Sequence, residues 1–142
     1  MKNNKEILSS ILKTTQMGQV GIRTVEPYVI SPGLKTALQS QLKEYDAIEQ
    51  QAMELAADRG WVLPQLHPGV KAMSRMATRM QLNGRETDSK IAGMMIKGNT
   101  QGVIKGLKNA HRCSHPDGRI AELSQKLLDT ENANIHQMEP FL

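Results

Sequence analysis

The sequence predicts an all-α protein, and three observations favour a single four-helix bundle over residues 1–142. Aromatic residues make up only 3% of the chain, and runs of Val, Ile, Thr and Tyr, which are typical of strands, are nearly absent. Apolar residues, nine Met among them, recur at steps of three and four, which places them on one face of a helix. A chain of 142 residues is long enough to bury a core, and its single cysteine excludes an intrachain disulfide.

The inward-facing pattern divides the chain into helices, of which three have clear faces. The first face is Ile7, Ile11, Thr15, Gly18, Ile22, Val25 and Val29. The second is Leu34, Leu38, Gln41, Tyr45, Ile48, Ala52 and Leu55. The last is Ile120, Leu123, Leu127, Glu131, Asn134 and Met138. We therefore expect long helices over about residues 5–30, 33–59, 86–110 and 119–138, with a short one over about 69–82.

Turn residues support these boundaries. The sequence SPG at 31–33 stops the first helix, and Pro32 can open the second because its missing N–H is not needed there. Gly60 occupies the position after a helix end where glycine is favoured. Asn83 and Gly84 break the short helix. Each predicted helix therefore has a local reason to begin or end where its apolar pattern does.

The connection between the second and third long helices is unusually long for a helical bundle. An antiparallel turn needs only a few residues, but residues 61–85 number about 25 and include the expected short helix. Such a helix of roughly 13 residues is about 20 Å long at 1.5 Å per residue. This is long enough to travel the length of a bundle and to join two helical hairpins as a crossover.

Two paired hairpins and a long crossover resemble the ferritin-like superfamily. The segment 7–64, which ends in AADRGWVLP, is similar to the bacterial spore-coat F-type branch, in which a helix pair ends in Gly-Trp followed by a proline. The matching residues are Gly60, Trp61 and Pro64. The resemblance implies a ferritin-like fold and a structural or stress-related role in a spore-forming bacterium.

A di-iron centre of the ferritin-like kind requires inward carboxylates and a histidine three residues after two of them. No Glu-x-x-His occurs in the chain. Glu131 and His136 are five residues apart, so with Glu131 inward His136 points to solvent. Glu49 and Glu26 fall at the margins of their helical faces. A bundle with buried hydrogen bonds is favoured, and an iron or manganese site near Glu131, Glu49 and Glu26 is the alternative.

The turn AHRCSHPDG contains the residue types of a zinc site. His111, Cys113 and His115 are close in sequence, and His67 could join them in a ferritin-like topology. Structural zinc usually takes four ligands, and alternating spacing with one cysteine matches no finger pattern, so a polar turn is favoured. Cys113 as a nucleophile flanked by two histidines is a further alternative.

Three glycines recur every four residues in the predicted third helix, at Gly98, Gly102 and Gly106. Glycine within a helix costs about 1 kcal/mol relative to alanine, so the repeat requires a compensating gain. Close packing against Gly18 and Gly21 of the first helix is the favoured explanation, because small residues allow backbones to approach. A dimer interface or a ligand lying against the bare helix are the alternatives.

Positive charge is concentrated between residues 61 and 116, where nine basic side chains face two acidic ones. Lys71, Arg75 and Arg79 form a basic face of the short helix. A solvated face is the ordinary explanation, and an acidic partner or membrane surface is the alternative. Nucleic acid is not expected as a partner, because no aromatic residue interleaves with these charges.

These observations favour a cytoplasmic ferritin-like bundle without a working di-metal site that acts by binding or assembly. No signal peptide, membrane span, cofactor or enzyme activity is expected, and a homodimer is the most plausible oligomer. The alternatives are a divergent metal-binding oxidoreductase or storage protein using iron or manganese, and a binder of an acidic partner through residues 61–116.

Overall fold

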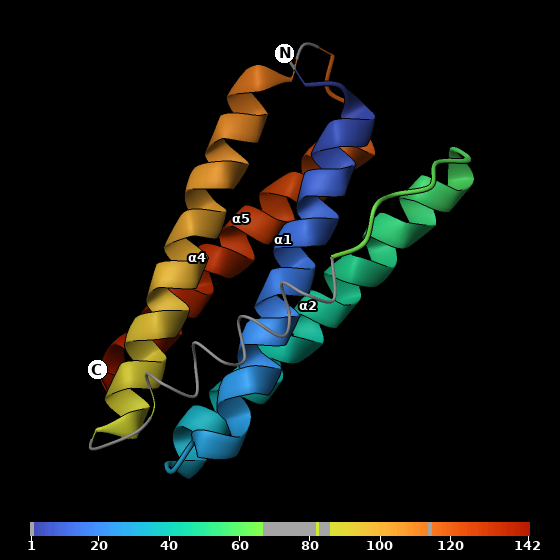
Figure 1. The fold of residues 1–142 in the computed structure, drawn as a ribbon. Coiled ribbons are helices and arrows are strands. Elements are labelled where there is room, and N and C mark those ends of the chain that lie inside the picture. Colours follow the sequence, from blue (N-terminus) through green and yellow to red (C-terminus); the bar gives the residue numbers. More distant parts are fainter. Residues whose placement is uncertain (1, 67–81, 83–85, 114) are drawn as a thin grey trace.

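A computed structural model describes residues 2–66, 82, 86–113 and 115–142. In these ranges the fold is all-α, as predicted, and consists of four long helices with no strand (Figure 1). The long helices are α1 (Asn4–Val25), α2 (Pro32–Asp58), α4 (Thr87–Arg112) and α5 (Gly118–Met138). Two single-turn 3₁₀ helices are η1 (Glu26–Tyr28) and η2 (Glu139–Phe141). The only β contact within the described ranges is an isolated bridge between Lys2 and Cys113.

The four helices form two antiparallel hairpins, α1 with α2 and α4 with α5 (Figure 1). The hairpins pack together through α2 against α5 and through α1 against both α4 and α5. The end of α2 and the beginning of α4 lie at opposite ends of the bundle (Figure 1). None of the described helices is long and apolar enough to cross a membrane.

The observed helices match the predicted ones within two residues, except at the end of the first. We expected this helix to continue to about residue 30, but α1 ends at Val25 and the chain continues as η1. The reason is Pro27, which has no N–H to donate to the carbonyl of Arg23 and whose ring would clash there. The short helix predicted over 69–82 lies outside the described residues apart from Leu82, which is buried.

Side chains at the helix ends hold the hairpins in place. Asp117 caps α5 by accepting hydrogen bonds from the backbone N–H groups of Arg119 and Ile120, at 3.0 and 3.3 Å. Asp117 also forms an ion pair with Arg59 just after α2, which joins the two hairpins at that end of the bundle. At the opposite end, Asp88 accepts hydrogen bonds from the backbone N–H groups of residues 30 and 31.

The core is mainly apolar, with buried polar side chains at its middle and a buried polar pair, Ser10 and Asn109, nearer one end. The predicted inward faces of α2 and α5 are confirmed as buried, including their polar members Gln41, Tyr45, Glu131 and Asn134. Phe141, in η2, lies against Gly33 at the beginning of α2, 3.6 Å from where a Cβ would stand. The fold thus places a layer of polar side chains at the centre of a mainly apolar core.

Candidate functional site

The centre of the bundle contains a polar network of four buried side chains, Tyr45, Asn99, Glu131 and Asn134. The Tyr45 Oη lies 2.9 Å from Asn99 Oδ1 and 3.1 Å from Glu131 Oε1. The amide of Asn134 donates a hydrogen bond to the same Tyr45 oxygen at 3.2 Å. The network brings together residues of α2, α4 and α5, so it lies where the two hairpins meet.

Glu131 is only 2% exposed, and this burial raises the pKa of its carboxyl to about 8, against a smaller lowering by the hydrogen bond from Tyr45. Near neutral pH the carboxyl is therefore mostly protonated. The geometry suits this form because the Tyr45 hydroxyl has one hydrogen but two acceptors within reach. A neutral Glu131 can donate to Tyr45, which leaves the Tyr45 hydrogen for Asn99.

Two glycines make room for this network. A Cβ at Gly102 of α4 would lie 2.9 Å from Glu131 Cδ, and a Cβ at Gly18 of α1 would lie 2.6 Å from two ring atoms of Tyr45. Both distances are too short for packed carbon atoms. The absence of these two side chains thus lets α1 and α4 approach Tyr45 and Glu131.

The predicted glycine stripe of α4 serves more than one purpose. Gly102 faces Glu131 and Gly106 faces Leu128, both on α5. Around Gly98, apart from its chain neighbours and the backbone of its own helix, no heavy atom of the described residues lies within 4 Å of where a Cβ would stand. The prediction that Gly18 and Gly21 are the packing partners is wrong. The physical reason is that long side chains from α5, rather than a second glycine backbone, fill the space beside α4.

A cavity of about 410 Å³ lies between α1 and α4, and we call it the central cavity. Four glycines line it, Gly18, Gly21, Gly98 and Gly102. Apolar side chains cover much of the remaining wall, among them Met17, Ile22, Val25, Met94 and Met95. Tyr45 and Glu131, which come from the helices behind α1 and α4, form its floor. Its volume lies within the range of small-molecule sites.

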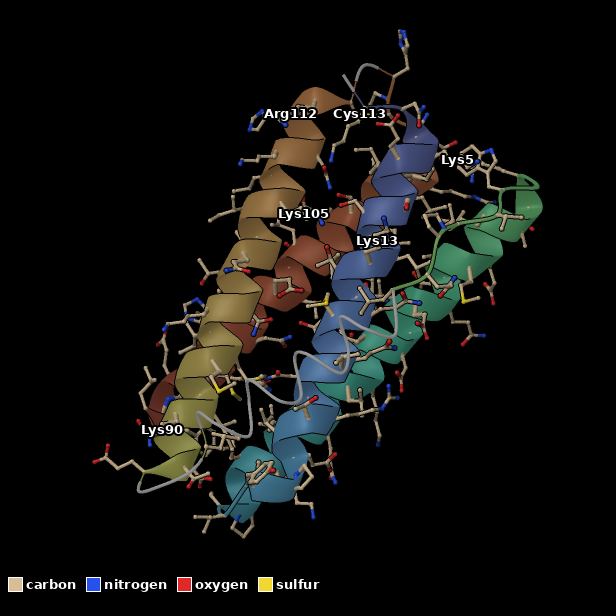
Figure 2. All side chains as sticks on the ribbon, in the orientation of Figure 1. Lys5, Lys13, Lys90, Lys105, Arg112 and Cys113 are labelled. Atoms are coloured by element: carbon tan, nitrogen blue, oxygen red, sulfur yellow. The ribbon has the colours of Figure 1, made fainter. Side chains whose placement is uncertain are left out.

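A group of lysines, Lys2, Lys13 and Lys105, stands at one side of this cavity, and we call it the lysine cluster. Lys13 and Lys105 line both the central cavity and a neighbouring hollow of about 400 Å³, which Lys2, Lys5 and Glu6 also border. Partial burial, and then the charges of Lys2 and Lys13, lower the pKa of Lys105. Figure 2 shows Lys13 and Lys105 in the same part of the bundle on α1 and α4, with Lys90 near the other end of α4.

The structure does not gather the carboxylates of the predicted iron or manganese site. Glu49 accepts hydrogen bonds from Gln16 and Gln19 of α1 at 3.2 and 3.3 Å, and Glu26 accepts one from Gln39 at 3.2 Å. Within the described ranges no three His, Cys, Asp or Glu side chains are placed to share a metal ion. Glu26 stands in η1, past the end of α1, which separates it from the central network.

The predicted orientation of His136 is confirmed: it is exposed and its Nδ1 lies 3.2 Å from Glu139, while Glu131 is buried. Two residues of the predicted zinc cluster, Cys113 and His115, contact Asn4 at the beginning of α1. Asn4 donates to the backbone carbonyl of His115 at 2.8 Å, and the Cys113 thiol lies 3.7 Å from the Asn4 side-chain oxygen.

Several predicted residues fall where the structure gives no description. His67, the proposed fourth zinc ligand, lies outside the described residues, as do Lys71, Arg75 and Arg79 of the predicted basic face. The sites that they were predicted to form therefore stay predictions.

Sequence reasoning missed Asn99 and the lysine cluster. Asn99 lies three residues before Gly102, on the same helical face, and a polar residue beside a glycine on a buried face was an available signal. Lys2 and Lys13 belong to an N-terminal region in which basic and acidic residues balance, which concealed them.

Comparison of the chain with protein-family models, with curated proteins and with solved structures gave no match. The ferritin-like resemblance therefore stays a prediction, and function is argued from the site.

Proposed function

We propose that this chain is a ferritin-like four-helix bundle without a working di-metal site, and that it acts by binding a small molecule in the central cavity. The observation that carries the proposal is a cavity of about 410 Å³ whose wall is mainly glycine and apolar side chains and whose floor presents a buried carboxyl group. Such a combination of apolar wall and few polar groups is typical of ligand sites.

The glycines support a binding role over a purely structural one. Gly102 and Gly18 are accounted for by Glu131 and Tyr45, and a Cβ at Gly21 would lie 3.6 Å from Met95 Cε, but Gly98 leaves space along the cavity. A glycine in a helix interior costs about 1 kcal/mol relative to alanine, and packing does not explain this cost at Gly98. Contact with a ligand that lies against the bare helix would offset this cost. At the floor, Glu131 or Tyr45 can form a hydrogen bond with the ligand.

The ferritin-like topology is part of the proposal. It is supported by the positions of the α2 end and the α4 beginning at opposite ends of the bundle (Figure 1), because a chain that joins these points has to cross the bundle's length. Ferritin-like proteins with metal carry it at the bundle centre, and here Tyr45, Asn99 and Asn134 surround the one central carboxyl.

The binding proposal is tested with N-phenyl-1-naphthylamine, a neutral apolar fluorophore whose emission rises in an apolar site. We expect saturable binding of one molecule per chain. Gly98→Leu, which places a side chain at the cavity wall, is expected to weaken this binding at least tenfold. Thr100→Leu is the matched control, because Thr100 is exposed on the same helix and does not line the cavity. Equal binding by both variants, or no saturable binding, would overturn the proposal.

The metal aspect is tested by elemental analysis of tag-free protein produced with iron, manganese and zinc in the medium. We expect less than stoichiometric iron and manganese. One or two equivalents that disappear in Glu131→Ala would instead establish the metalloprotein alternative. Zinc that disappears on substitution of Cys113 would point to the turn after α4.

A further inference from the structure

Within the described part of the chain, the lysine cluster has little compensating negative charge. Among the described residues, none of the ion pairs involves Lys2, Lys13 or Lys105. Lys2 donates a hydrogen bond to the neutral amide oxygen of Asn109 at 2.9 Å, and Glu6 is the one carboxylate among the residues of the neighbouring hollow. Partial burial lowers the pKa of Lys105, and repulsion from the charges of Lys2 and Lys13 lowers it further. An anion beside them would remove that repulsion.

Apart from Lys13 and Lys105, none of the described residues that line the central cavity carries a full charge near neutral pH. Its wall is mainly apolar, and the carboxyl of Glu131 on its floor is mostly protonated there, because burial raises its pKa to about 8. A charged group of a ligand would lose its hydration at this floor without gaining a charged partner. It therefore belongs at the other side, where Lys13 and Lys105 border solvent.

We propose that the ligand of the central cavity is a small amphipathic anion. Its carboxylate or phosphate group lies between Lys13 on α1 and Lys105 on α4, and its apolar chain follows the wall past Gly98 towards the floor. This inference rests on the proposed binding function and adds the chemical class of the ligand. The charge complementarity of the lysine cluster and the apolar cavity that shares two of its lysines carry the argument.

The test is displacement of N-phenyl-1-naphthylamine by four probes that share a ten-carbon chain, each used below the concentration at which it forms micelles. The probes are decanoate, decyl phosphate, neutral decanol and decyltrimethylammonium. We expect both anions to displace the fluorophore at concentrations at least tenfold lower than the cation. Their advantage should shrink at high salt, because the lysines border solvent. The better of the two anions identifies the headgroup.

Substitution of the lysines tests whether the preference for anionic probes depends on the lysine cluster. In the double variant Lys13→Gln with Lys105→Gln, we expect the affinity for decanoate to fall at least tenfold, while the affinity for decanol changes little. Lys90→Gln is the matched control, since it removes a charge from the far end of α4 (Figure 2). If the cation and decanol displace the fluorophore as well as the anions do, or if the double variant behaves like the control, the inference is wrong and the binding function stands. If the fluorophore itself does not bind, the binding function fails and the inference fails with it.

Discussion

Glycine has different roles at the floor and at the wall of the central cavity. At the floor, Gly18 and Gly102 leave room that Tyr45 and Glu131 occupy, with a hypothetical Cβ only 2.6 and 2.9 Å from their atoms. At the wall, Gly98 leaves room that no heavy atom of the described residues occupies within 4 Å. The repeat of glycines along one helix is therefore two devices, one for packing and one for space. Substitutions at the two places distinguish them.

The largest expected effect is the dependence of the free energy of unfolding on pH that Glu131, at the floor of the cavity, causes. The pKa of Glu131 is about 8 in the folded chain and near its ordinary value of 4.5 in the unfolded chain, so folding takes up a proton between these pH values. The contribution of Glu131 to stability is full below about pH 4.5 and falls by up to about 1.4 kcal/mol per pH unit until about pH 8. Glu131→Gln, which cannot ionise, should remove this loss.

The measurement is urea unfolding of the wild type and Glu131→Gln at pH 5, 7 and 9. We expect the free energy of unfolding of the variant to rise relative to that of the wild type as the pH rises, by several kcal/mol in total. Other titrating groups contribute equally to both proteins and cancel in the difference. Glu122→Gln is the control, because Glu122 is exposed on the same helix. A difference in stability that does not change with pH would show that the Glu131 carboxyl is ionised in the folded protein.

The sequence was sufficient for the fold class but only partly for this site. Helical periodicity predicted the buried faces of α2 and α5, including Glu131 and Tyr45, because the spacing of side chains around a helix is fixed. It did not reveal the packing partner of Gly102, because the rotation of each helix about its axis depends on side chains from several helices at once. The same dependence concealed the lysine cluster, which is formed by residues more than 90 positions apart in the chain, Lys13 of α1 and Lys105 of α4.

At the floor, Gly102→Leu should destabilise the protein by about 3 kcal/mol or more. The new side chain would overlap the Glu131 carboxyl, which cannot move without losing its hydrogen bond with Tyr45. Overpacking of a core typically has a cost of this order. Urea or thermal unfolding measures it. A melting temperature equal to that of the wild type would mean that this side of α4 is open to solvent.

Gly18→Ala tests the other half of the floor with a single methyl group. Alanine favours the helix by about 1 kcal/mol, but the methyl group would lie 2.6 Å from the Tyr45 ring. The ring is held by hydrogen bonds to Asn99 and Asn134, so it cannot turn aside freely. We expect a net destabilisation of about 1–2 kcal/mol, since overpacking exceeds the helical gain. Adding Tyr45→Ala should remove the clash, so that Gly18→Ala becomes stabilising in that background.

Gly98→Ala at the wall has the smallest expected effect and the opposite sign. The substitution gives the same helical gain of up to about 1 kcal/mol as at Gly18, and the methyl group meets no heavy atom of the described residues within 4 Å. Urea unfolding of the two alanine variants side by side therefore separates packing from helix propensity, because the propensity contribution is common to both. If Gly98→Ala destabilises the protein as much as Gly18→Ala does, the wall is packed like the floor, and the space assigned to a ligand is already filled. If it stabilises the protein without weakening fluorophore binding, the glycine is required neither for folding nor for access by a small ligand, and only a larger side chain at this position can close the cavity.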